Sequence, residues 1–136
     1  VRAICDLNRP LAQQFAQSKS IPNVYADLGE MLSGEQLDVV HILTPPQIHF
    51  STACQIIAAG VDAFIEKPLC HTVANCQELR QRAEAAVRTI GVSHNFLYFP
   101  VYENLVSDLR SGRLGQIDQV DIVWNKELGQ VTGGPF

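Results

Sequence analysis

Short apolar runs alternate with segments of helical periodicity along most of this chain. The apolar runs predict five strands, over residues 1–5, 21–25, 37–43, 61–65 and 88–92. Each of these runs ends at a polar or proline-rich turn. Between them, apolar residues recur three or four positions apart, which predicts helices over residues 8–18, 27–32, 47–59 and 72–87. Strands that alternate with helices favour an α/β fold with a parallel sheet and right-handed crossovers.

Local signals place the ends and the buried faces of these elements. Asn8, Asp27 and Thr72 are predicted N-caps, because their side-chain oxygens can accept from the first free amides of a helix. Gly60 predicts the end of the third helix. The run Val39-Val40-His41-Ile42-Leu43 is typical of a strand covered on both faces. In the third predicted helix, the face expected to be buried consists of Ile48, Thr52, Ile56 and Ala59. In the fourth, it consists of Val73, Cys76, Leu79 and Ala83.

The pattern changes after the fifth strand. Residues 100–111 predict a further helix, and Ile117 to Trp124 alternates polar and apolar positions, which predicts a strand with one face toward water. One-sided alternation is typical of antiparallel sheets. We therefore expect a domain boundary near Leu114, with residues 1–113 in one domain and residues 114–136 at the start of another.

Composition narrows the class of protein. The 136 residues are 46% hydrophobic and 18% charged, as in an ordinary globular protein, and no apolar run is long enough to span a bilayer. The net charge of -4 argues against nucleic acid and anionic membranes as partners. Asp6 interrupts any signal-peptide core.

The four cysteines predict no disulfide and no metal site. They form no CxxC pair and have no metal-like spacing to histidine. We expect free thiols in a reducing cytoplasm, and only Cys70, beside the charged motif described next, is considered as a reactive thiol. A structural role is favoured even there.

The segment Phe64-Ile65-Glu66-Lys67-Pro68 carries the strongest chemical signal. A buried strand that ends in two opposite charges lies where open α/β sheets bind ligands. Pro68 stops the strand, and a Lys-Pro bond can be cis at modest cost. Lys67, partly buried in a cleft, could exchange a proton with an alcohol or carbonyl oxygen, and Glu66 could hold a ribose or orient the lysine. By itself the pentapeptide fits a surface ion pair about equally well.

Three further groups follow strand ends. Asp6 stands where dinucleotide-binding folds hold the adenosine ribose, which favours NAD, whereas Arg9 could pair with the 2′-phosphate of NADP. Residues 44–46, Thr-Pro-Pro, precede a helix whose first amides are free, and His49 could hydrogen-bond across that turn. After the last strand, the side-chain amide of Asn95 could contact the carboxamide of a cofactor. For His94 a structural role is favoured.

Taken in order, these residues resemble the glucose–fructose oxidoreductase / inositol dehydrogenase / MocA (Gfo/Idh/MocA) family. The resemblance rests on Asp6 after a strand, residues 44–49, Glu66-Lys67-Pro68, residues 91–95, and Pro100 followed by residues 111–117. It covers almost the whole chain.

The resemblance implies a Rossmann-like sheet and an NAD(P)-dependent oxidoreductase that acts on a sugar or cyclitol hydroxyl. Lys67 would be catalytic and would lie beside the nicotinamide. Residues 1–113 would be most of the NAD(P)-binding domain, residues 114–136 would begin the substrate domain, and the full-length protein would be a homo-oligomer. The implied cofactor-binding residues are Asp6, Arg9, Leu43, Thr44, Pro45, His49, Glu66, Lys67 and Asn95.

Two departures from the family pattern matter. The chain has no G-x-G-x-x-G turn for the pyrophosphate, and it lacks the family's catalytic histidine of the second domain. In a sheet of order 3-2-1-4-5-6 the missing first strand is the central one, so we expect a gap between the strands that end at Asp6 and at Leu43. The chain is then a piece of a longer enzyme, inactive alone, or another polypeptide fills the gap.

The alternative is a non-catalytic relative that keeps the fold as a sensor or partner-binding module. The two departures favour it, and the intact Glu-Lys-Pro triplet argues against it.

Overall fold

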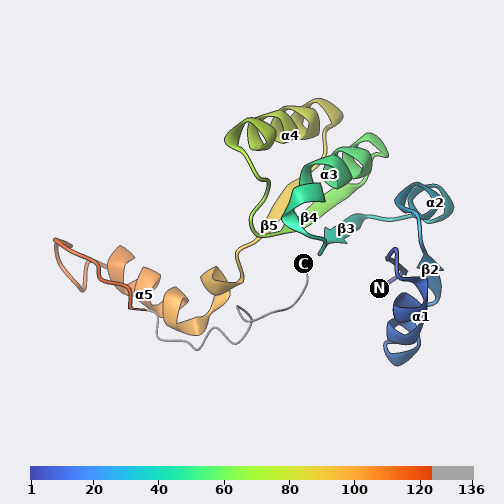
Figure 1. The fold of residues 1–136 in the computed structure, drawn as a ribbon. Helices are drawn as coiled ribbons and strands as arrows, with labels where there is room; N and C mark the ends of the chain where they lie inside the picture. The colour runs from blue at the N-terminus through green and yellow to red at the C-terminus, as the bar shows by residue number, and fades with distance from the viewer. Residues whose placement is uncertain (124–136) are drawn as a thin grey trace. The chain divides into compact units, whose positions relative to one another are not determined.

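A computed structural model describes residues 1–123, and the chain divides after Ser93 into two compact units (Figure 1). In the first unit the strands are β1 (Ala3–Cys5), β2 (Asn23–Tyr25), β3 (Val39–Ile42), β4 (Asp62–Glu66) and β5 (Ile90–Ser93). Its helices are α1 (Arg9–Ser18), α2 (Leu28–Gly34), α3 (His49–Ala58) and α4 (Val73–Ala86). The second unit contains α5 (Pro100–Arg110). None of the helices within residues 1–123 is long and apolar enough to cross a membrane.

The strands form two sheets, and every pairing in them is parallel. One sheet has the order β1-β2, and the other has the order β3-β4-β5. The predicted α/β class is therefore confirmed. Within the part of the chain that the structure describes, β1 does not pair with β3. This agrees with the expected gap at the place of the central strand.

The core of the β3-β4-β5 sheet lies on one face. Ile42 and Ile65 point from the strands toward α3 and α4, where Ile56 and Leu79 meet them, and all four are almost fully buried. Each such side chain contributes about 2 kcal/mol relative to an exposed one. The two helices share this face because both crossovers step in the same direction with the same hand (Figure 1).

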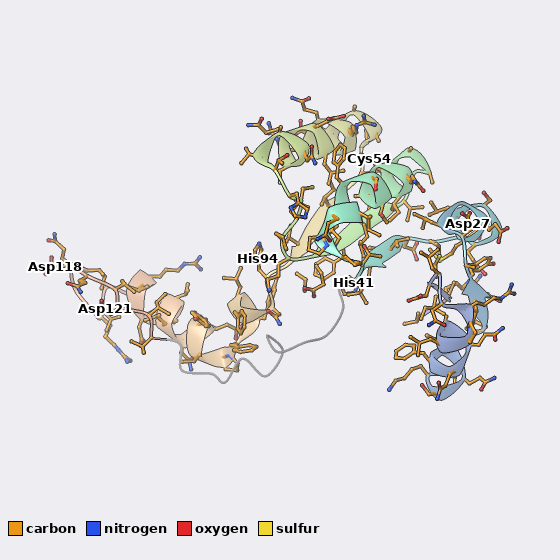
Figure 2. The ribbon with its side chains drawn as sticks, viewed as in Figure 1. Asp27, His41, Cys54, His94, Asp118 and Asp121 are labelled. Atoms are coloured by element: carbon orange, nitrogen blue, oxygen red, sulfur yellow. The ribbon has the colours of Figure 1, made fainter. Side chains whose placement is uncertain are left out.

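The other face of that sheet is open in the first unit, which corrects the prediction that both faces of β3 are covered. Val39 is 55% exposed, and His41, labelled on β3 in Figure 2, is exposed as well. The ring of His41 packs against Phe64 of β4, with 4.9 Å between centroids. The expectation was wrong because α3 and α4 both lie on the opposite face.

Two predicted helix faces also need correction. Residues 46–48 form a 3₁₀ helix, so α3 begins at His49 and its buried stripe is His49, Ala53, Ile56 and Ile57. Ile48 is 44% exposed, and Ala59 is exposed. In α4, Leu79 and Ala83 are buried as predicted, whereas Val73 is exposed because it occupies the first turn.

The three predicted N-caps are confirmed. Asn8 Oδ1 accepts from the backbone N–H of Leu11 at 3.2 Å, and Asp27 Oδ1 accepts from that of Glu30 at 2.9 Å. Thr72 Oγ1 accepts from that of Asn75 at 3.1 Å. Each cap stabilises its helix by about 1 kcal/mol.

The described residues after α5 differ from the prediction. Helix α5 is present, but residues 117–123 form no strand, so the expected antiparallel sheet is not found in the described residues. An extended segment becomes a strand only when a neighbour pairs with its backbone groups, and the described residues supply none here. Trp124 lies outside the described residues. The domain boundary at Leu114 stays a prediction.

Candidate functional site

The ends of β3 and β4 bring together the two motifs that the sequence marks. In the parallel register, Ile42 lies beside Ile65, so Leu43 and Thr44 leave the sheet at the same edge as Glu66 and Lys67. On the far side of β4, Glu66 lies beside Ser93 of β5. Sequence reasoning did not name Ser93 as a site residue, although its position at the end of a parallel strand could have indicated it. We call this edge the strand-end site.

Thr44 contributes a buried hydroxyl without a partner. Among the described residues, its Oγ1 is the one buried side-chain oxygen or nitrogen with no hydrogen bond. Leaving such a group unpaired costs about 1–3 kcal/mol, so its position suits a ligand that offers a hydrogen-bonding group. Leu43 and Pro45, on either side of Thr44, are exposed.

Glu66 and Lys67 form the charged part of the site. Glu66 is half-buried, and its Oε2 accepts a hydrogen bond from the backbone N–H of Lys67 at 3.2 Å. The Lys67–Pro68 peptide bond is cis, as the sequence allowed. Lys67 itself is exposed rather than partly buried.

His49 lies behind the site instead of lining it. The residue is fully buried, with Nε2 2.7 Å from the carbonyl oxygen of Thr44 and Nδ1 2.9 Å from that of Pro68. The ring has no exposed surface with which to touch a cofactor. The sequence indicated a hydrogen bond across the turn, but not that one ring would reach both motifs.

The remaining predicted residues lie elsewhere. Asp6 follows β1, is exposed, and accepts a hydrogen bond from the backbone N–H of Asn8 on Oδ1 at 2.7 Å. Arg9 begins α1 and is also exposed. Both lie next to the β1-β2 sheet, which does not pair with the β3-β4-β5 sheet in the described residues, so sheet pairing does not join them to the strand-end site. Asn95 belongs to the second unit.

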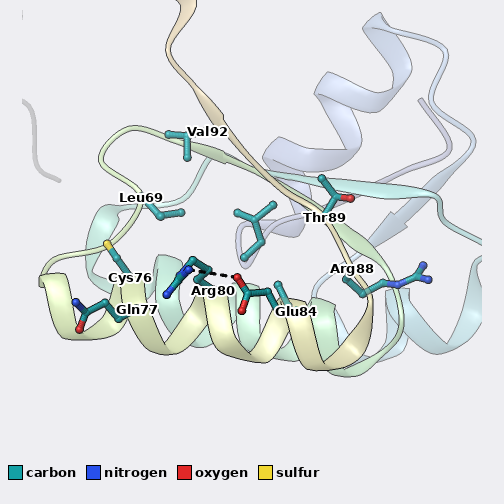
Figure 3. Close-up of a pocket in the computed structure, with 10 residues that line it drawn as sticks. Leu69, Cys76, Gln77, Arg80, Glu84, Arg88, Thr89 and Val92 are labelled. Carbon is teal, nitrogen blue, oxygen red and sulfur yellow. Dashed lines mark hydrogen bonds and ion pairs between the residues drawn. The ribbon is translucent and has the colours of Figure 1, made fainter.

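The first unit also contains a surface cavity. It has a volume of about 540 Å³ and is bounded by α4, β5 and Leu69 (Figure 3). Arg80 and Glu84 form an ion pair on its wall, with 3.4 Å between Nη1 and Oε1. None of the predicted site residues lines this cavity.

The thiols near the site are buried rather than activated. Cys70 is 7% exposed, and burial raises its pKa to about 12, with smaller contributions from Cys76 and Cys54. Burial also raises the pKa of Cys54. Because the thiolate is the reactive form, such thiols are nearly inert at neutral pH. All four cysteines are free, and this environment favours a structural role for Cys70.

These groups fit an NAD-type cofactor. Asp6 is an exposed carboxylate at a strand end, suited to accept hydrogen bonds from ribose hydroxyls. Thr44 adds an unpaired hydroxyl, and Glu66 and Lys67 add charged groups at the edge where open α/β sheets bind ligands. The fold and the site together define a dinucleotide-binding α/β domain.

Comparison with known proteins identifies the family. Residues 1–94 match the Gfo/Idh/MocA oxidoreductases, which have an NAD-binding Rossmann fold, and the chain belongs to this family. The D-apiose dehydrogenase of Paraburkholderia graminis is 33% identical over 134 residues, which is 98% of this chain and 36% of that protein.

Solved structures agree with this assignment. An NAD-binding oxidoreductase from Klebsiella pneumoniae superimposes with a TM-score of 0.78 at 29% identity, over 85% of this chain and 31% of that one. A myo-inositol 2-dehydrogenase from Lactobacillus plantarum shares the fold, with a TM-score of 0.79 at 19% identity over 86% of this chain and 35% of the other. The chain spans about a third of the length of the curated relatives that it matches.

Proposed function

We propose that the protein is an NAD(P)-dependent oxidoreductase that acts on a hydroxyl or carbonyl group of a sugar, a cyclitol or a related small compound. The observation that carries the proposal is the shared edge at which Thr44, Glu66 and Lys67 leave adjacent parallel strands. Membership of an NAD-binding oxidoreductase family supports the cofactor class. The substrate class is supported by the similarity to a D-apiose dehydrogenase.

Each residue of the strand-end site has a distinct role in this proposal. NAD(P)⁺, when bound, accepts a hydride from the carbinol carbon. Lys67 orients the substrate hydroxyl and, in its neutral amine form, takes its proton at Nζ. Glu66 holds the backbone at Lys67 through its hydrogen bond to that residue's N–H. Thr44 and Pro45 contact the cofactor from the end of β3.

Asp6 sets the preference between the two cofactors. Its carboxylate would accept hydrogen bonds from the adenosine ribose and repel a 2′-phosphate, which favours NAD. Arg9, three residues later at the start of α1, could pair with that phosphate, so NADP stays within the proposal. Asn95 would meet the carboxamide of the cofactor.

The proposal extends to the organisation of the whole protein. Residues 1–113 form most of the cofactor domain, and residues 114–136 begin a substrate domain that carries most of the substrate pocket. The full-length protein is a homo-oligomer in the cytoplasm.

A fluorescence titration with NADH tests the cofactor assignment. We would titrate the 136-residue chain beside the protein as its whole gene encodes it. Binding by the longer protein, with weak or no binding by the short chain, is expected because the pyrophosphate has no glycine turn in this sequence. Micromolar binding by the short chain would show that the strand-end groups suffice alone.

The second candidate is a non-catalytic relative that acts as a sensor or partner-binding module. The exposure of Lys67 favours it, because proton transfer by lysine is usually helped by burial. Absence of NADH binding by both proteins would select this candidate over the enzyme.

A further inference from the structure

His49 is the one buried polar or charged residue that the described part of the chain contains. It is the first residue of α3, and both of its ring nitrogens point at backbone carbonyl groups. The Thr44 oxygen lies 2.7 Å from Nε2, and the Pro68 oxygen lies 2.9 Å from Nδ1. The two carbonyls belong to the segments that follow β3 and β4, and these are the segments that carry the strand-end site.

Because both partners are carbonyl oxygens, they restrict which protonation form of the His49 ring can hydrogen-bond to both. A carbonyl oxygen only accepts hydrogen bonds, and a neutral imidazole has one N–H and one lone pair. The neutral ring could therefore donate to one carbonyl, while its lone pair would face the other carbonyl oxygen at less than 3 Å. An imidazolium donates to both. Both distances lie in the range of charge-assisted hydrogen bonds.

We propose that His49 is a positioning residue that carries a proton on each ring nitrogen and ties the Thr44 segment to the Lys67–Pro68 segment. The positive end of the α3 dipole opposes a cation at this place, and the two carbonyl dipoles offset that cost. Sheet hydrogen bonds fix β3 against β4 only as far as the strand ends. Beyond them, the ring is the connection that sets where Thr44 and Lys67 stand relative to each other.

The effect of His49 on cofactor binding rests on the proposed function, whereas the two hydrogen bonds of its ring do not. A ring that holds both segments would keep the Thr44 hydroxyl and the Lys67 amino group at a fixed separation, as a preorganised site needs. His49 would then affect cofactor binding without touching the cofactor.

The first experiment reads the ring directly in the unmodified 136-residue chain. Nitrogen-15 NMR of the histidine side chains at neutral pH distinguishes protonated from unprotonated ring nitrogens, and the signals of His49 are those lost in His49→Phe. We expect both nitrogens of His49 to be protonated. One unprotonated nitrogen would overturn the double hydrogen bond, and this measurement on the wild type needs no variant to fold.

The second experiment measures the two segments by amide hydrogen exchange, with His71→Phe as the control. His71 is an exposed histidine on the loop that follows Pro68. In His49→Phe we expect the hydrogen-bonded amides of Ile48 and Lys67 to exchange about tenfold faster or more, whereas His71→Phe leaves them unchanged. If His49→Phe leaves the exchange rates of either segment unchanged, the proposal that His49 ties the two segments together is overturned.

The third experiment separates this inference from the proposed function. In the protein that binds NADH, His49→Phe should raise the dissociation constant about tenfold, and His71→Phe should leave it unchanged. If His49→Phe binds NADH with the same dissociation constant as the wild type, the positioning role is overturned. If the wild type binds no NADH, the proposed function fails, and the tie between the segments is decided by the ring protonation and the exchange rates.

Discussion

The ring of Phe64 covers Gly91 on the neighbouring strand so closely that a Cβ at Gly91 would lie 2.5 Å from Phe64 Cδ2. The two residues are register partners in β4 and β5, and Phe64 also packs against His41 of β3. One aromatic ring thus spans three strands on the open face of the sheet. Gly91 is needed here for close approach, since real Cβ atoms do not come within 3.0 Å of such atoms.

Replacement of Gly91 by alanine should destabilise the fold by about 1–2 kcal/mol, because the Phe64 ring must shift away from its contact with His41. Urea unfolding followed by circular dichroism would measure the change. In the background of Phe64→Leu the same replacement should cost clearly less. An equal cost in both backgrounds would show that the loss does not come from the ring.

Titration of Cys70 should make the fold less stable in strong base. Burial, with Cys76 and Cys54 nearby, raises the pKa of Cys70 from 9.0 to about 12. The unfolded chain releases this proton first, so the stability due to the buried thiol is fully present below pH 9 and is lost between pH 9 and 12. The loss should reach on the order of 1–2 kcal/mol near pH 10.5.

Urea midpoints at pH 8 and pH 10.5 would measure this loss against Cys70→Ala, which keeps every other titrating group. The wild type should lose more stability between these pH values than the variant does. Parallel pH profiles would contradict the assignment to Cys70.

Replacement of Lys67 by alanine in the full-length protein should lower turnover at least about a hundredfold, because the substrate hydroxyl loses the group that takes its proton. Steady-state NADH production would measure it. Lys19→Ala is the matched control, since Lys19 is an exposed lysine at the end of α1. Turnover unaffected by the loss of Lys67 would refute its catalytic role.

Replacement of Asp6 by asparagine should weaken NADH binding about tenfold and reduce discrimination against NADPH, because the side chain no longer carries a charge that repels a 2′-phosphate. Titrations of the full-length protein with each cofactor would measure both effects. Asp38→Asn, at an exposed aspartate before β3, is the control. A retained preference for NADH would assign the selectivity to another residue.

Several features of this protein followed from the sequence because they depend on neighbours in the chain. The N-caps at Asn8, Asp27 and Thr72 were predictable, since each accepts from an amide three residues later. The strands and helices of the first unit followed from periodicity, and parallel alternation placed Thr44, Glu66 and Lys67 at strand ends. Short-range hydrogen bonding and side-chain spacing determine all of these.

Other features were decided only by the tertiary structure. Register brought Ser93 beside Glu66, and packing left one face of the β3-β4-β5 sheet open, where the apolar run in β3 had indicated two covered faces. The segment 117–123 alternates like a strand but has no partner among the described residues. His49 reaches Pro68 only because β4 returns alongside β3. Such contacts join residues far apart in the chain, so local sequence carries no direct signal of them.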